Sequence, residues 1–201
     1  MSKILLSIVA ILTPYSFFAQ QTTFDYEIGA GFSIFQNSRL SNPIMLGPSI
    51  FASIWTPVNG KLNLGAEISS NLSYGKNSYE ESTEIDPPPF NSNKAIIRSN
   101  ENTLSLKISY EIHSKLQATI NLDIANYNPT SFKYYLNEVF IAESYQSQIN
   151  YLQKIDLGLK FRVRQFNLSF SGSIRTRDSN LWRTGYLGAQ LRLSYHFLSL
   201  P

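Results

Sequence analysis

Residues that could form a hydrolytic centre occur near the two ends of the chain. Ser194 and His196 stand two positions apart, and Asp25 falls in the first predicted strand. A serine nucleophile, a histidine base and an orienting carboxylate within hydrogen-bond reach would support acyl transfer. However, alternate residues of a strand share one face, so such a trio also arises by chance where two polar strand faces meet. We therefore favour polar lining residues over a triad; the other histidine of the chain is His113.

Metal binding is the second chemistry that the residue types allow. Carboxylates gather in one acidic stretch, at Glu80, Glu81, Glu84 and Asp86. Their spacing lacks the Asp/Asn pattern of a dedicated calcium loop. The chain contains no cysteine, which excludes thiolate metal sites and disulfides. We therefore expect a solvated acidic loop, no metal site and no cofactor.

The last predicted strand, residues 185–197, shows which kind of element positions these groups. One face is apolar and ends in aromatics: Leu187, Ala189, Leu191, Leu193, Tyr195 and Phe197. The other face mixes glycine, polar and charged residues: Tyr186, Gly188, Gln190, Arg192, Ser194 and His196. A period of two indicates a β-strand. The charged face does not suit a soluble core, but it suits the filled lumen of a small membrane barrel.

The same alternation predicts eight strands, over residues 24–35, 46–55, 62–74, 103–112, 116–124, 149–164, 166–174 and 185–197. In the second strand Phe51 would point inward with Ser49 and Ser53, which suggests a bulge or a shift. Asn59 and Gly60 predict a hairpin turn in which the Asn-Gly pair supplies positive φ. The connections alternate long and short. An even-stranded outer-membrane barrel has this pattern, because its loops are extracellular and its tight turns periplasmic.

Two of the long connections cover residues 75–101 and 126–148. The first is acidic and contains Pro87, Pro88 and Pro89, so it cannot lie within a membrane. The second carries aromatic and branched residues, so we expect its flanking strands to continue beyond the membrane. A soluble lipocalin-like barrel is the nearest alternative, but it would place the apolar residues inside and the charges outside.

Opposite charges are balanced on the inward faces. Six acids (Asp25, Glu27, Glu67, Glu111, Asp123, Asp156) face six bases (Lys107, Lys154, Lys160, Arg162, Arg164, Arg192). Buried ions are costly unless paired, and eight strands leave an interior about wide enough for side chains. We therefore expect internal pairing rather than an ionic pore, with Glu67 and Lys107 paired at mid-depth. The predicted lumen ion-pair network comprises Glu27, Glu67, Lys107, Glu111, Asp123, Asp156, Lys160, Arg162 and Arg192.

The N-terminus has the features of a secretory signal peptide: Lys3, an apolar run over residues 4–12, and the small residue Ala19. We expect a signal peptide over residues 1–19 and one barrel domain over residues 20–201. A mean hydropathy of -0.15 is compatible with a membrane barrel, because alternating faces average out. The net charge of +3 is far too small to indicate a nucleic-acid partner.

These patterns resemble the small eight-stranded outer-membrane β-barrel superfamily over essentially the whole mature chain. Such barrels end in a strand with an aromatic at or near the terminus, which the barrel assembly machinery recognises. Tyr195 and Phe197 match this assembly signal, although residues 198–201 follow the last aromatic. The resemblance implies an all-β protein of the outer membrane: an eight-stranded antiparallel transmembrane up-and-down β-barrel with long extracellular loops and short periplasmic turns.

The superfamily includes several activities, so the resemblance identifies architecture better than function. We expect an integral, non-enzymatic protein with a side-chain-filled lumen and surface-exposed loops, acting in envelope integrity or surface interaction. Its expected partners are outer-membrane lipids and lipopolysaccharide, the assembly machinery, and an extracellular or envelope protein. No peptidoglycan-binding domain follows Pro201, so we expect no tether to the cell wall. The alternatives are a conduit for small apolar molecules and a lipid A-modifying enzyme.

Overall fold

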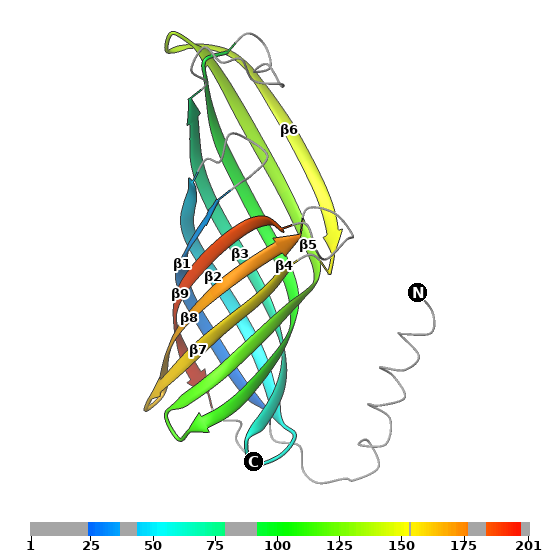
Figure 1. Ribbon diagram of the computed structural model, residues 1–201, viewed down its shortest axis with the longest axis vertical. Coiled ribbons are helices and arrows are strands. Elements are labelled where there is room, and N and C mark those ends of the chain that lie inside the picture. Colours follow the sequence, from blue (N-terminus) through cyan, green and yellow to red (C-terminus); the bar gives the residue numbers. More distant parts are fainter. Residues whose placement is uncertain (1–23, 37–43, 79–91, 153, 177–183, 198–201) are drawn as a thin grey trace, which may run out of the picture.

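The computed structural model describes residues 24–36, 44–78, 92–152, 154–176 and 184–197, and Figure 1 shows their strands winding around a common axis. No helix among these residues is long and apolar enough to cross a membrane. The described ranges contain nine strands: β1 (Asp25–Gln36), β2 (Ile44–Pro57), β3 (Leu62–Ser78), β4 (Lys94–His113), β5 (Leu116–Leu136), β6 (Val139–Tyr151), β7 (Lys154–Val163), β8 (Phe166–Thr176) and β9 (Thr184–Phe197).

The strands close into a ring of eight positions, and every pairing is antiparallel. The order around the ring is β1, β2, β3, β4, β5, β7, β8, β9, and β9 pairs again with β1. In this closing pair Tyr26 lies opposite Phe197, and Phe35 lies opposite Gly188. Closure removes the sheet edges that would otherwise leave backbone groups unpaired in lipid. The prediction of an eight-stranded up-and-down barrel is confirmed.

β6 and β7 together occupy one position of the ring. β6 pairs with the distal half of β5, where Ala125 lies opposite Tyr151, and β7 pairs with the proximal half, where Leu122 lies opposite Ile155. From Leu122 to Ala125 is three steps along β5, whereas from Tyr151 to Ile155 is four, so this side carries one extra residue. An extra residue of this kind is a β-bulge. The strand predicted over residues 149–164 is therefore interrupted.

The barrel is inverted relative to a soluble protein, since its outward face is apolar and its inward face polar. Ile28, Ile50 and Ile68 are 58%, 63% and 62% exposed on the outside. Glu67 and Asn71 are 2% and 1% exposed on the inside. Lipid-facing strands of outer-membrane barrels alternate in this way, so the exposed isoleucines mark the hydrocarbon-facing surface.

Two details predicted from the sequence are wrong. β2 keeps a constant register with both β1 and β3, so it is neither bulged nor shifted, and Phe51 is simply a buried lumen residue. No described glycine, Gly60 included, has positive φ. The β2–β3 turn is held instead by Asn59 Oδ1, which accepts hydrogen bonds from the backbone N–H groups of Lys61 (3.0 Å) and Leu62 (2.9 Å).

The two long connections contain more strand than predicted, because β3 runs to Ser78 and β4 already begins at Lys94. Residues 126–148 form a hairpin whose turn residues, Asn137 and Glu138, have φ of 50° and 68°. The expectation that strands continue beyond the membrane there is correct. At the tip Lys94 Nζ donates a 2.6 Å hydrogen bond to Glu138, and this bond holds the pKa of that carboxyl below its ordinary value. Residues 80–86 and 1–19 lie outside the described ranges.

The distal parts of β3 to β6 form an extension beyond the ring (Figure 1), comprising residues 72–78, 94–100, 127–136 and 139–149. A hydrophobic cluster covers its inner side, formed by Met45, Ala95, Ile97, Phe132 and Tyr134. The cluster is apolar where the lumen below it is charged. Hydrophobic packing therefore stabilises the extension from inside, with about 25 cal/mol per Å² of apolar surface buried.

Because the outward face is apolar and the inward face polar, a new charge should have different effects at neighbouring positions of β9. Leu191 is 52% exposed near the middle of the strand, whereas Gln190 is buried and shares a small cavity with Glu101. Leu191→Lys places a charge in hydrocarbon and should cost about 2 to 4 kcal/mol of unfolding free energy. Gln190→Lys should cost clearly less, because Gln190 borders a polar cavity that is lined by Glu101 as well as Lys154. Urea unfolding in micelles measures both, and equal losses would contradict the assignment of the two faces.

The closing strand also carries the proposed assembly signal. The Tyr195 ring lies 4.7 Å from Phe197 and 5.4 Å from Phe166, so the aromatics form a patch at the seam. We expect Tyr195→Ser with Phe197→Ser to lower the amount of heat-modifiable barrel in the outer membrane. The control is Leu187→Ser with Leu193→Ser, which removes two more exposed apolar residues of β9 (62% and 55%) without touching the aromatics. Comparable losses in both doubles would argue against a specific role for the aromatics.

Candidate functional site

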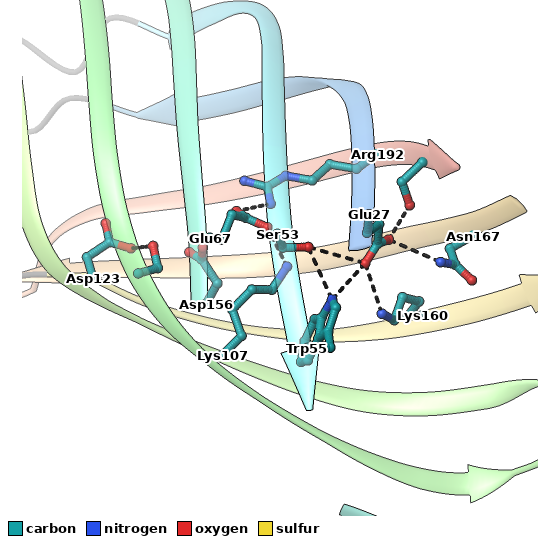
Figure 2. Close-up of polar contacts among 12 residues, drawn as sticks. Glu27, Ser53, Trp55, Glu67, Lys107, Asp123, Asp156, Lys160, Asn167 and Arg192 are labelled. Atoms are coloured by element: carbon teal, nitrogen blue, oxygen red, sulfur yellow. Dashed lines mark hydrogen bonds and ion pairs between the residues drawn. The ribbon is translucent and has the colours of Figure 1, made fainter. Parts of the chain in front are cut away.

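The first element of the lumen is a carboxylate held between two cations at mid-depth. Arg192 of β9 donates from Nη1 to Glu67 Oε1 over 2.7 Å, and Lys107 of β4 donates to the other oxygen. Figure 2 shows the three side chains converging from β3, β4 and β9. Glu67, Lys107 and Arg192 are only 2%, 7% and 5% exposed. The structure thus brings Glu67 and Lys107 together and adds a second partner, Arg192, on the far side of the ring.

A second carboxylate, Glu27 of β1, collects donors from five other residues. Lys160 Nζ lies 3.3 Å from its Oε2, Trp55 Nε1 donates to Oε2 over 3.0 Å, and Asn167 donates to Oε1 over 3.1 Å. Ser53 (Figure 2) and Ser194 also donate to this carboxylate. Charge-assisted bonds of this kind are about twice as strong as neutral ones, so Glu27 is a fully satisfied anion.

Two aromatic rings of β2 link these clusters. The Trp55 ring centroid lies 4.4 Å from Lys160 Nζ and 5.0 Å from Lys107 Nζ. The Phe51 ring lies 4.8 Å from the Arg192 guanidinium and 5.5 Å from Lys107 Nζ. Cations close to an aromatic face are stabilised by the ring quadrupole, more so where water is excluded. The rings therefore fill the lumen and separate cations that would otherwise repel one another.

A third cluster lies on β5 and β7. Lys154 Nζ stands 3.3 Å from Asp156 Oδ2 and 3.8 Å from Asp123 Oδ2, and Ser105 donates to Asp123 over 2.9 Å. One ammonium group thus serves two carboxylates. Lys154 was counted among the inward bases, yet the predicted ion-pair network omits it.

The remaining members of the predicted network are less well paired. Glu111 and Arg162 lie at the mouth near the β4–β5 and β7–β8 turns, and neither forms an ion pair with another described residue. From the sequence, Phe51 was expected to point inward but was interpreted as a sign of a bulge, and Trp55 was not recognised as a lumen residue. The signal available was their odd numbering, since alternate residues of a strand share a face and both residues therefore lie on the face of Ser49 and Ser53.

The space left between these side chains is small. One cavity of about 20 Å³ is bordered by Glu27, Lys107 and Thr119, and another of about 30 Å³ by Asn71, Glu101 and Lys154. A water molecule needs about 10 to 15 Å³ measured in this way. Each cavity can therefore hold one to three waters, and neither offers a path for a solute.

The candidate catalytic trio does not assemble. Ser194 Oγ donates to the Glu27 carboxylate rather than to His196. His196 Nε2 lies 3.6 Å from Asp25 Oδ2, and neither ring nitrogen has a hydrogen-bond partner among the described residues. At the other histidine, Ser114 Oγ lies 3.3 Å from His113 Nδ1 in an exposed turn. No group of three or more metal-ligating side chains gathers within the described ranges.

Comparisons with known proteins place this fold. No family model and no curated protein matches the chain. Its structure is similar to the crystal structure of Ail, the attachment invasion locus protein of Yersinia pestis, with 13% identity and a TM-score of 0.51 for the complex with the heparin analogue sucrose octasulfate. A second structure of the same protein gives 15% identity and a TM-score of 0.50. Both matches cover 89% of this chain and 100% of the other. The chain thus has the fold of the small eight-stranded outer-membrane β-barrels.

Proposed function

We propose that this protein is a non-enzymatic outer-membrane barrel that acts through its outer surface and its extension, in envelope integrity or surface interaction. The observation that carries the proposal is the filled lumen. Glu67, with both its cations, and Glu27 with its donors occupy the cross-section, and cavities of about 20 and 30 Å³ remain. A conduit for apolar molecules would need a wider and less charged passage, so the surface is the better candidate.

The extension supports a role at the surface. β5 continues to Leu136 and β6 begins at Val139, well past the end of β8 at Thr176. Val139 and Tyr145 of β6 are 66% and 75% exposed. A group of large exposed side chains on a solvent-facing sheet marks a contact surface more often than single scattered apolar residues do. The name of the Yersinia pestis protein of similar fold, attachment invasion locus protein, describes the same kind of role.

Truncating the extension tests where the function lies. Pro129 and Ser147 face one another in the β5–β6 hairpin, so residues 130–146 can be replaced by Asn-Gly without disturbing the ring. We expect the truncated barrel to remain heat-modifiable in the outer membrane while detergent resistance or surface adhesion of the cells is lost. The control replaces only Asn137 and Glu138 with Asn-Gly. Full complementation by the truncated barrel would place the function elsewhere.

The filled lumen predicts coupling between its charges. Glu67→Gln leaves Lys107 and Arg192 without their acceptor and should cost about 3 to 5 kcal/mol of unfolding free energy. Lys107→Met should cost less, because Arg192 still pairs with Glu67. In the double variant the two losses should be clearly less than additive. A simple charge swap of Glu67 and Lys107 should restore stability only in part, since the new lysine would face Arg192.

This cycle is read by denaturant unfolding of the purified barrel. Lys133→Met combined with Glu67→Gln provides the control, because Lys133 lies on the extension and is half exposed. That pair should be additive within about 0.5 kcal/mol. Strict additivity of the Glu67 and Lys107 variants would mean that the two groups do not interact in the folded barrel.

A further inference from the structure

Two hollows lie one above the other on the outward face of the barrel. The upper one is lined by β3 to β6, and the lower one by β1 to β6. The upper hollow has a volume of about 800 Å³ and the lower one about 730 Å³. Tyr127 of β5 borders both, so they form one continuous depression. This depression is outside the barrel and is separate from the charged lumen.

The upper hollow combines cations, tyrosines and neutral polar groups. The Arg98 guanidinium lies 5.6 Å from the ring of Tyr74. Lys133 Nζ lies 3.8 Å from Glu143 Oε1, and its side chain is 49% exposed. Further hydrogen-bonding groups on the outward face come from Asn100, Ser131 and Ser147. Guanidinium and ammonium groups bind phosphate oxygens, and tyrosine faces with amides and hydroxyls suit sugar rings.

The lower hollow is apolar. Its outward side chains include Ile50, Ile68, Leu104 and Ile149, and the three isoleucines are more than half exposed. The outward polar groups of this lining are Asn102, Ser70 and the hydroxyl of Tyr127 at its upper edge. Hydrocarbon is therefore the occupant that this surface favours.

The step from one hollow to the other coincides with the membrane boundary. The outward residues of β4 are apolar up to Leu104 and polar from Asn102 to Arg98. On β6 the change falls between Ile149 and Ser147, and Tyr127 lies opposite Ile149 in the register. Tyrosines are enriched where hydrocarbon meets headgroups. The upper hollow thus lies at headgroup level and the lower one at acyl-chain level.

We propose that the two hollows bind one anionic glycolipid of the outer leaflet, of the lipid A class. Its acyl chains lie along Ile50, Ile68 and Leu104, and its phosphorylated sugar lies against the upper lining, where Arg98 and Lys133 bind phosphate. This inference rests on the proposed function in one respect, namely that the barrel resides in the outer membrane. A soluble polyanion would leave the apolar hollow uncovered, and a plain phospholipid would leave the sugar-binding groups unused.

The test uses the full-length mature barrel in neutral detergent micelles with bisphosphorylated lipid A as the probe, and native mass spectrometry measures the retained lipid. Arg98→Ala with Lys133→Ala should weaken retention about tenfold or more. The matched control, Lys61→Ala with Lys115→Ala, removes the same charge from exposed turns at the opposite end and should leave retention unchanged. Ile68→Trp, which fills the lower hollow, should weaken retention without changing any charge.

Probe chemistry separates the possible occupants. Dephosphorylated lipid A should bind the unmodified barrel about as weakly as lipid A binds the Arg98/Lys133 variant. Equal retention by the Arg98/Lys133 variant and the turn control would overturn the inference, as would unchanged retention by the Ile68→Trp variant. Cell fractionation distinguishes failure of the lipid site from failure of the proposed function. A barrel found in the outer membrane that fails the lipid test contradicts only the lipid site, whereas absence from that membrane contradicts the proposed function as well.

Discussion

The pairing of buried charges is the constraint on which this barrel depends. The outward face is apolar, so the charges of the strands are collected inside, where an unpaired ion would be costly. Glu67 meets this demand with Lys107 on the neighbouring strand β4 and with Arg192 across the ring, and Glu27 likewise pairs across the ring with Lys160. These contacts join β1, β3, β4, β7 and β9. Pairing therefore holds these strands in place around the lumen as well as neutralising the buried charges. The proposed function therefore lies on the outer surface and the extension.

The faces of the strands could be predicted from the sequence because their side chains have a strict period of two. That pattern gave the ring of eight, the lipid-facing residues and the inward set that contains Glu67 and Lys107. Partner choice could not be predicted in the same way. Glu27 and Lys160 are separated by 133 positions, and only the closed ring brings them to 3.3 Å. The contact of Trp55 with lysines was not predicted, because an aromatic residue on a polar inward face suggests a shifted strand register when its neighbours in space are unknown.

The length of the extension was underestimated for a related reason. Beyond the membrane the outward face becomes polar at Asn102 and Ser147, so simple apolar alternation no longer identifies the strands. The sequence pattern did not reveal the bulge between β6 and β7. This bulge separates β7, which belongs to the ring, from β6, which belongs to the extension. The same change in polarity that hid these strands creates the outward depression around Tyr127, with hydrocarbon-facing residues below it and cations above. Lumen and outer surface thus have separate roles: the first provides stability, and the second offers binding chemistry.

The central claim is that the lumen is filled by its own paired side chains. Its most direct test is the current that the purified, refolded and unmodified barrel carries in a planar lipid bilayer under an applied voltage. A filled lumen predicts no steady single-channel conductance above the bare membrane, because the two cavities between the described lumen side chains measure about 20 and 30 Å³. A stable, reproducible open-channel current from barrels shown to be folded would contradict it and would favour a transport function.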